Sequence, residues 1–476
     1  MKASKLIRFL LIPSFLLAGC EFSDLAFWKK KDQPSQQEEQ GQEEGGEETP
    51  QEPVDITFKT SVNVKMEKLL NGAGGFYNIE YQFSDAFFKE DAEVYSKDLS
   101  MLSLGAALSA TYEEWVSDFL TTCKFENHVL HDYDKEPTKD TLGYALAHKE
   151  IDGSELFTVL IRGHQYKAEW QNNFIIGEEG DHEGWLARST ELYSALSSYI
   201  ATYKGEKTIK LWIAGYSRAG AISNLLSSLI LRSDGINVSA KNMYVYTFEA
   251  PSSISEEHVH EYKNIHNIIN SGDLITYIPS TKYGLSRIGE DYEIYDENLS
   301  TLIKSFDSQI DIPEFVEFEG GGKTIKNDVE CAEYLISTIF DYNGDASKSA
   351  QTREEYVERY QAGLSYSIGL MFALSPTTRS EMMASLTNDP QAMLAFFDTS
   401  GTTLANLMKP YLDKDHIDYN DTELVAACAV LVGAFSTIFS GFLGLYLGSA
   451  KTNITRNLNM HYPEVTYCLL QNAHLK

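Results

Sequence analysis

The stretch IKLWIAGYSRAGA, residues 209–221, decides the fold of this chain. Residues 209–214 form an apolar run of strand length, and residues 222–230 carry an apolar stripe at helical spacing. Residues 215–221 join the two without a linker and place Ser217 at the bend. A strand that turns at once into a helix with serine at its apex is typical of a nucleophile elbow, in which a strained turn exposes the hydroxyl.

The small residues around Ser217 fit such an elbow. Strand and helix nearly touch there, so the positions two before and two after the serine must be small. Gly215 and Ala219 meet this need, although glycine is more usual at the second position, and Gly220 follows. The motif alone is weak because it arises by chance, but the flanking strand and helix strengthen it. The alternative is a tight turn in which Ser217 only caps a helix.

Strand and helix patterns alternate around this elbow. Such an alternation predicts an α/β fold with a mostly parallel sheet and helices on both faces. The expected strands are residues 156–161, 209–214, 243–248 and 265–270, and the expected helices include 192–203, 222–230 and one or two within 93–123.

Composition excludes some classes of protein. The chain has 476 residues, 69 acidic against 39 basic side chains, and a net charge of −30, which disfavours a nucleic-acid partner. Its 11 histidines show no tight spacing with cysteines, so no structural metal is expected. Five cysteines are too few for a disulfide scaffold, and we expect at least some of them to be buried thiols.

The first 20 residues read as an export signal. A positively charged start is followed by a short apolar run, which ends in Leu17-Ala18-Gly19-Cys20. This ending resembles a bacterial lipobox, which implies that the thiol of Cys20 receives a diacylglycerol. The alternative is an ordinary secretory signal in which Cys20 occurs by chance.

Residues 21–54 form an acidic segment rich in Gln, Glu, Gly and Pro, for which we expect disorder and a tethering role. The predicted location is therefore extracytoplasmic, in the bacterial cell envelope. We expect membrane attachment there through lipidated Cys20.

Five motifs, in order along the chain, resemble those of the class 3 lipase family of α/β-hydrolases. The resemblance spans about residues 95–290 and 457–472 and leaves 296–455 outside. The motifs are Ile161-Arg162-Gly163-His164 with its downstream Trp170, His182-Glu183-Gly184-Trp185, Thr247-Phe248-Glu249-Ala250-Pro251 with Glu249 in place of glycine, Asp273 to Pro279, and His461-Tyr462-Pro463.

Serine needs a neutral imidazole as its base, and elbow enzymes supply an acid and then a histidine further along the chain. Asp273 follows a predicted strand at its carboxyl end, where ligand-facing residues gather. His461 follows Asp273 and precedes Pro463, which can open a helix. We therefore predict Ser217, Asp273 and His461 as the catalytic residues. Glu249, which also follows a strand, is the competing acid, and the resemblance favours Asp273 because the matched motif carries this aspartate.

An oxyanion needs two backbone donors that are already aimed at it. The first is expected from the N–H of Arg218, at the start of the elbow helix. The resemblance implies the N–H of His164 as the second, although the family carries a hydroxyl side chain at this position. This chemistry requires neither a cofactor nor a metal, and His182 is expected to support the site.

The predicted organisation is a signal peptide at 1–20, a tether at 21–54, an α/β-hydrolase core at 55–295, a helical insertion or lid at 296–455, and a C-terminal part of the core at 456–476. Residues 425–450 carry no charge and are long enough to span a bilayer. A single crossing would separate His461 from Ser217. We therefore expect this segment to be buried or to form a lid.

These features predict a serine hydrolase of lipid acyl esters, of lipase or phospholipase type. Two alternatives remain open. The first is a non-catalytic surface binding protein on a hydrolase scaffold, and the second is a serine peptidase of the same fold.

Overall fold

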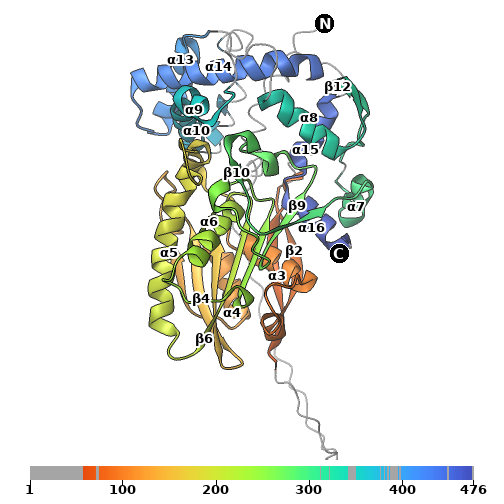
Figure 1. Cartoon of the computed structure of the whole chain (residues 1–476). Coiled ribbons are helices and arrows are strands. Elements are labelled where there is room, and N and C mark those ends of the chain that lie inside the picture. Colours follow the sequence, from red (N-terminus) through yellow and green to blue (C-terminus); the bar gives the residue numbers. More distant parts are fainter. Residues whose placement is uncertain are drawn as a thin grey trace, which may run out of the picture.

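The computed structural model describes residues 57–70, 74–310, 312–320, 322–340, 350–375, 377–379, 381–382, 385, 395, 398–446 and 450–473. The predicted signal, Cys20 and the tether through residue 54 lie outside these residues. Figure 1 shows the described part as a central sheet with helices on both sides and a helical layer across one end.

Seven strands form the central sheet, in the order β11-β9-β7-β6-β5-β4-β3. The four predicted strands are confirmed, and all four are neighbours in this sheet. They are β5 (Ser154–Ile161), β6 (Thr208–Tyr216), β7 (Met243–Phe248) and β9 (Ile265–Asn270). These four strands run parallel, and β11 (Glu290–Ile294) pairs parallel with β9. The predicted α/β-hydrolase fold with a mostly parallel sheet is therefore confirmed.

One edge of the sheet was not predicted from the sequence. β4 (Tyr144–Ile151) pairs antiparallel with β5, and β3 (Glu126–His131) pairs antiparallel with β4. A separate antiparallel hairpin, β1 (Lys59–Glu67) with β2 (Phe76–Ser84), packs beside the helices of one face.

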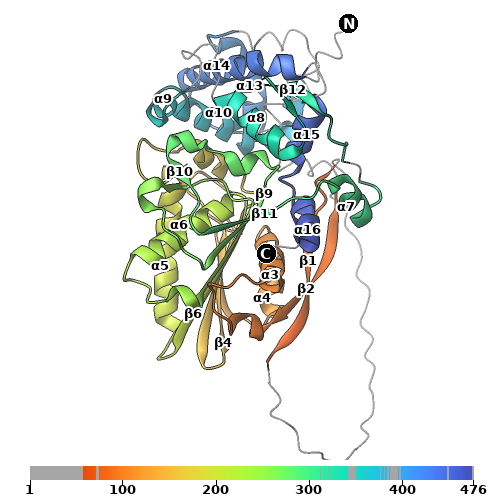
Figure 2. The same cartoon turned by 45° about the vertical axis from the view of Figure 1, so that its right-hand side comes forward.

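Helices cover both faces of the sheet because alternate residues of β6 point to opposite sides. Leu211 and Ile213 enter the core beneath α5 (Glu183–Tyr203) and α6 (Arg218–Arg232). Trp212 and Ala214 enter the opposite core, beneath α3 (Lys97–Ser109), α4 (Glu113–Thr122) and α16 (Pro463–Asn472). Figure 2 shows these two layers on either side of the sheet.

Between β11 and α16 the described residues are mostly helical. The helices are α7 (Leu299–Phe306), α8 (Asp328–Phe340), α9 (Arg353–Tyr356), α10 (Ala362–Ala373), α13 (Thr402–Lys414), α14 (Asp421–Tyr446) and α15 (Ala450–Asn459), and one short hairpin joins β12 (Phe318–Gly320) to β13 (Lys323–Ile325). α10 contacts the segment after β5, whereas α8 and α15 contact the segment after β9. The insertion therefore packs at the carboxyl ends of the central strands (Figures 1 and 2), the end at which β6 leads into Ser217.

The apolar segment at 425–450 falls largely within α14. Leu424 and Cys428, near the start of this helix, are buried against Met408 and Leu412 of α13. Among the residues that the structure describes, no helix combines the length and the apolar character needed to cross a bilayer. The four cysteines within the described ranges, Cys123, Cys331, Cys428 and Cys468, are buried free thiols, which confirms that expectation.

A buried ion pair ties the end of the insertion to its beginning. Arg456 of α15 donates from Nε to Asp328 Oδ1 at 2.8 Å and from Nη2 to Oδ2 at 2.9 Å. Its Nη1 donates to Ser300 Oγ at 2.9 Å. Both charged side chains are almost completely buried. Because a buried charge needs its partner, this pair fixes the approach of the chain to His461.

We expect Arg456→Met to lower the free energy of unfolding by about 3–5 kcal/mol, because it leaves the Asp328 carboxylate buried and unpaired. Chemical denaturation measures this change. The double variant Arg456→Met/Asp328→Asn removes the orphaned charge and should recover part of the loss. A single variant as stable as the parent would contradict the assigned role of the pair.

Candidate active site

Ser217 lies directly after β6 and before the first residue of α6. Its backbone has φ 56° and ψ −127°, and its N–H donates to the carbonyl of Phe248 at 2.8 Å. A serine with positive φ is strained, and such strain persists only where the surroundings enforce it. The predicted strained turn at Ser217 is therefore confirmed.

The small residues of the elbow are required by close backbone contacts. A Cβ on Gly215 would lie 2.4 Å from the carbonyl oxygen of Ala219, and one on Gly220 would lie 2.8 Å from the Cβ of Ala250. A Cβ on Gly163 would lie 2.1 Å from the carbonyl oxygen of Tyr216. The loop after β5 thus rests against the elbow itself. Ala219 fits because its methyl group is fully buried in the adjoining core.

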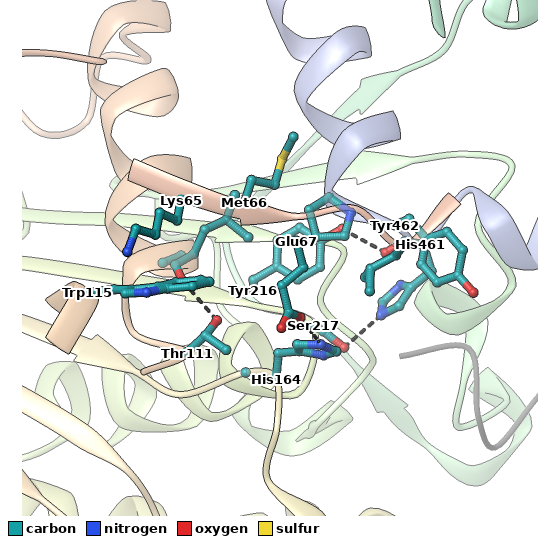
Figure 3. Close-up of a pocket in the computed structure, with 15 residues that line it drawn as sticks. Lys65, Met66, Glu67, Thr111, Trp115, His164, Tyr216, Ser217, His461 and Tyr462 are labelled. Atoms are coloured by element: carbon teal, nitrogen blue, oxygen red, sulfur yellow. Dashed lines mark hydrogen bonds and ion pairs between the residues drawn. The ribbon is translucent and has the colours of Figure 1, made fainter. Parts of the chain in front are cut away.

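The structure brings the three predicted residues into one hydrogen-bonded set. His461 Nε2 lies 2.8 Å from Ser217 Oγ, and His461 Nδ1 lies 2.6 Å from Asp273 Oδ2. Asp273 Oδ1 accepts the N–H of Ile275 at 2.8 Å, which fixes the carboxylate. Ser217 is 6% exposed, His461 3% and Asp273 0%. Figure 3 shows His461 pointing at Ser217.

Main-chain contacts hold His461 in place. Tyr216 Oη donates to the carbonyl of His461 at 2.8 Å, and Asn270 Nδ2 donates to the carbonyl of Met460 at 3.1 Å. Asn457 Nδ2 donates to the carbonyl of Gly272 at 2.6 Å. Pro463 occupies the first turn of α16, as the sequence predicted. The histidine is therefore fixed from the elbow on one side and from the segment that bears Asp273 on the other.

The two predicted oxyanion donors flank Ser217. The N–H of Arg218 belongs to the first turn of α6, where backbone donors have no partner within the helix. His164 follows Gly163 and lines the same pocket as Ser217. Arg218 and His164 therefore both adjoin Ser217, and the assignment of their N–H groups as oxyanion donors stays a prediction.

A buried ion network anchors both donor segments, and sequence reasoning missed it. Arg162 Nη2 donates to Glu169 Oε1 at 2.6 Å, and Arg218 Nη1 donates to Glu169 Oε2 at 2.7 Å. Thr141 Oγ1 also donates to Glu169 Oε1, at 2.7 Å. Glu169 is fully buried. One carboxylate thus joins the residue before Gly163 to the residue after Ser217. Burial of a charge leaves no local pattern in the sequence.

The His164 side chain has an unpredicted partner. Its Nε2 lies 2.5 Å from Oε2 of Glu67, the last residue of β1. Tyr112 Oη donates to Glu67 Oε1 at 2.6 Å. Burial alone raises the pKa of Glu67, but the imidazole and the neighbouring donors outweigh it, so the pKa lies below its ordinary value. Glu67 is therefore ionised, and it holds His164 beside Ser217 (Figure 3).

A pocket opens at Ser217 with an empty volume of about 490 Å³, its mouth included. Its walls come from β1, α3, α4, the loop after β5, the elbow and the segment around His461. The lining residues are Lys65, Met66, Glu67, Leu69, Ala107, Leu108, Thr111, Trp115, Gly163, His164, Tyr216, Ser217, His461, Tyr462 and Pro463. Most of the wall is apolar, and its titratable side chains include Lys65, Glu67, His164 and His461.

His182 lies away from this pocket. Its ring is fully buried and stacks on Trp185, with 3.6 Å between ring centroids and 7° between ring planes. Burial lowers the pKa of His182 to about 3, so the ring is neutral and structural. Within the described ranges, no three His, Cys, Asp or Glu side chains cluster as a metal site would require.

The fold and the hydrogen-bonded serine, histidine and aspartate define the class of protein as an α/β-hydrolase. Residues 151–283 match the model of the family described as lipase (class 3). This match supports the resemblance drawn from the motifs over that range. No curated protein sequence matches the chain.

Solved structures of fungal lipases share part of the fold. A Rhizomucor miehei lipase in complex with its propeptide is 19% identical, with a TM-score of 0.31 and coverage of 43% of this chain and 71% of that chain. A lipase from Rhizopus microsporus var. chinensis is 15% identical, with a TM-score of 0.30 and coverage of 42% and 75%. Lipase II from Rhizopus niveus is 13% identical, with a TM-score of 0.31 and coverage of 42% and 80%.

Glu464, next to the pocket wall, supplies a pH-dependent contribution to stability. Its Oε1 accepts the N–H groups of Leu69 at 2.6 Å and Leu70 at 3.1 Å, which joins α16 to the end of β1. Burial raises the pKa of Glu464 to about 7. The folded chain therefore holds a proton here that the unfolded chain releases near pH 4.5.

Because the folded-state pKa of Glu464 is the higher one, its contribution to the free energy of unfolding is complete below about pH 4.5. That contribution falls as the pH rises towards 7. The expected loss is of order 3 kcal/mol, from about 1.4 kcal/mol per pKa unit. Denaturation at a series of pH values should show this slope, and Glu464→Gln should flatten it. An equal slope in both proteins would contradict this assignment.

Proposed function

We propose that this protein is a serine hydrolase that cleaves carboxylic esters of lipids. The observation that carries the proposal is the Ser217–His461–Asp273 hydrogen-bonded set at a strained elbow. The match of residues 151–283 to the class 3 lipase family supports lipid esters as the substrate class. A largely apolar pocket at Ser217 is suited to an acyl chain.

In the first step, Ser217 Oγ attacks the ester carbonyl while His461 Nε2 takes its proton. Asp273, held by the N–H of Ile275, orients the imidazole through Nδ1 and stabilises the imidazolium that forms. The backbone N–H groups of Arg218 and His164 donate hydrogen bonds to the carbonyl oxygen and stabilise the negative charge that develops on it. His461 then gives its proton to the leaving alcohol.

In the second step, water replaces the alcohol in the pocket. His461 takes a proton from that water as the water attacks the acyl-enzyme carbonyl. His461 then returns the proton to Ser217 Oγ as the bond between Oγ and the acyl carbon breaks, which releases the fatty acid. Gly163 and Glu169 serve both steps by keeping the loop that bears His164 in contact with the elbow. Each proposed backbone donor therefore belongs to a segment that these contacts hold in place.

We expect Ser217→Ala to lower kcat for a long-chain ester by about 10⁴-fold or more, with little change in folding, because the nucleophile is lost. Hydrolysis of a series of esters of increasing acyl length, with and without a lipid interface, measures activity and preference together. A fluorophosphonate probe should label the parent at Ser217 and leave the variant unlabelled.

Equal hydrolysis by parent and variant would refute this mechanism. An unlabelled and inactive parent would instead favour a non-catalytic binding role. Peptide substrates in the same assay separate an esterase from a peptidase.

We also propose attachment to the outer face of a bacterial membrane through Cys20. The apolar run that ends in small residues and Cys20 supports this location. Cys20→Ser should move the protein from the membrane fraction to the soluble fraction. Stable anchoring needs two acyl chains, which a diacylglycerol on Cys20 supplies and the variant lacks. Cys123→Ser, at a buried thiol, is the matched control and should stay with the membrane. Retention of the Cys20 variant in the membrane would overturn the proposal.

A further inference from the structure

Glu249 occupies a costly position in the backbone and in the core. It is the first residue after β7, its φ is +48°, and its side chain is fully buried. A positive φ favours glycine, and the resemblance has glycine at this place. Burial of a carboxyl group adds a second cost. The contacts of this carboxyl explain why it is there.

The Glu249 carboxyl group joins two segments of the active site. Its Oε2 accepts the N–H of Asn270 at 2.8 Å, and its Oε1 lies 2.8 Å from Thr466 Oγ1. Asn270 ends β9, three residues before Asp273, and Thr466 lies in α16, five residues after His461. The carboxyl therefore connects the strand that leads to the acid with the helix that follows the base.

The contacts continue from Thr466 to the backbone of His461. Thr466 Oγ1 lies 3.1 Å from Tyr216 Oη, and Tyr216 Oη donates to the carbonyl oxygen of His461 at 2.8 Å. Tyr216 is also the residue before Ser217. A chain of hydroxyl groups thus runs from Glu249 to the base and touches the segment of the nucleophile on its way.

The direction of these hydrogen bonds depends on the state of Glu249. Tyr216 gives its one proton to the His461 carbonyl, so at the contact with Thr466 the Tyr216 oxygen accepts and Thr466 donates. Thr466 has one proton to give, either to Tyr216 or to Glu249. A neutral Glu249 donates to Thr466, and each hydroxyl then both donates and accepts. An ionised Glu249 takes the Thr466 proton, and Thr466 then no longer donates to Tyr216.

The surroundings favour the neutral state. The titratable groups facing Glu249 are Asp273 and His461, with the Tyr216 phenol at the far end of the chain. The Arg287 guanidinium donates to the carbonyl of Ala250, the residue after Glu249, at 3.1 Å and is paired with Asp291. Burial, and then the Asp273 charge, raise the pKa of Glu249 to about 8, although the Asn270 N–H, the Thr466 hydroxyl and His461 lower it.

We propose that Glu249 is a positioning residue that works as a neutral acid. Its proton orders the Thr466–Tyr216 hydroxyl chain and so fixes the backbone of His461 relative to Ser217. This inference rests on the proposed ester hydrolysis and assigns no contact between Glu249 and substrate. Asp273 alone supplies the negative charge that orients the imidazole.

The test compares Glu249→Gln with Glu249→Leu. Glutamine can accept from Asn270 and donate to Thr466 as a neutral acid does, so kcat/KM at pH 7 should stay within about threefold of the parent. Leucine breaks the chain, and kcat should fall by about 30-fold or more with KM little changed, because His461 loses its alignment. Asp273→Asn is the contrasting variant and should lose far more activity than Glu249→Gln.

The pH profile separates this role from simple packing. Above about pH 8 the parent loses the Glu249 proton and the order of the hydroxyl chain, so its kcat/KM should fall relative to that of Glu249→Gln. Infrared spectra of the parent at pH 7 should contain the carbonyl stretch of a buried protonated carboxyl group that Glu249→Gln removes. Glu464→Gln is the matched control, and its kcat/KM should still fall above about pH 8 as that of the parent does.

Two results would overturn the inference. The first is a loss of activity in Glu249→Gln as large as that in Asp273→Asn, which would mean that Glu249 acts as an anion. The second is the absence of the Glu249 infrared band. If the parent itself neither cleaves esters nor reacts with a fluorophosphonate, the proposed function fails, whereas the infrared result still decides the state of Glu249.

Discussion

The close approach of three backbone segments at Ser217 is the constraint on which the rest of the structure depends. Gly163, Gly215 and Ala219 lie so near one another that an added methyl group at either glycine would meet main-chain atoms. This packing holds Ser217 at positive φ and places the loop after β5 beside it. The buried Glu169 carboxylate forms ion pairs with Arg162 and Arg218 and so holds these segments together. The nucleophile and both proposed oxyanion donors therefore form one rigid unit, set before any substrate arrives.

The base reaches this unit by a longer route. His461 lies 188 residues beyond Asp273, and the intervening chain contains the whole helical insertion. The Arg456–Asp328 pair and the Asn457 contact with Gly272 return the chain to the carboxyl end of β9 just before His461. The insertion thus has a structural task besides any role over the pocket, because its two ends set the entry of the histidine. Substitutions that disturb this helical layer should therefore lower activity by displacing His461, even where no helix touches substrate.

The sequence predicted the parts of the site that local chemistry determines. Ser217 could be found because a strand, small residues and a helical stripe meet there, and Asp273 and His461 because strand ends and a helix-opening proline mark them. Glu67 and Glu169 were missed because their partners, His164 and Arg218, lie 97 and 49 residues away, and no spacing records such a contact. The antiparallel strands β3 and β4 were missed for a similar reason. β4 is almost entirely buried and β3 mostly exposed, so neither shows the alternation of a half-buried strand.

Three buried carboxyl groups near the catalytic set have different charge states, and each state follows from its neighbours. Glu67 faces the His164 imidazole, which lowers the pKa of this carboxyl group, and Glu67 is ionised. Glu464 and Glu249 meet mainly backbone N–H groups and hydroxyls, and burial keeps both protonated through the weakly acidic range. Among the described contacts, Asp273 is the carboxylate that touches His461. Its other described contact is the N–H of Ile275, not a cation. A second bare charge beside it would make the imidazolium too stable to return its proton to the leaving alcohol. The protonated state of Glu249 therefore leaves Asp273 as the carboxylate that faces the base of a strongly acidic chain.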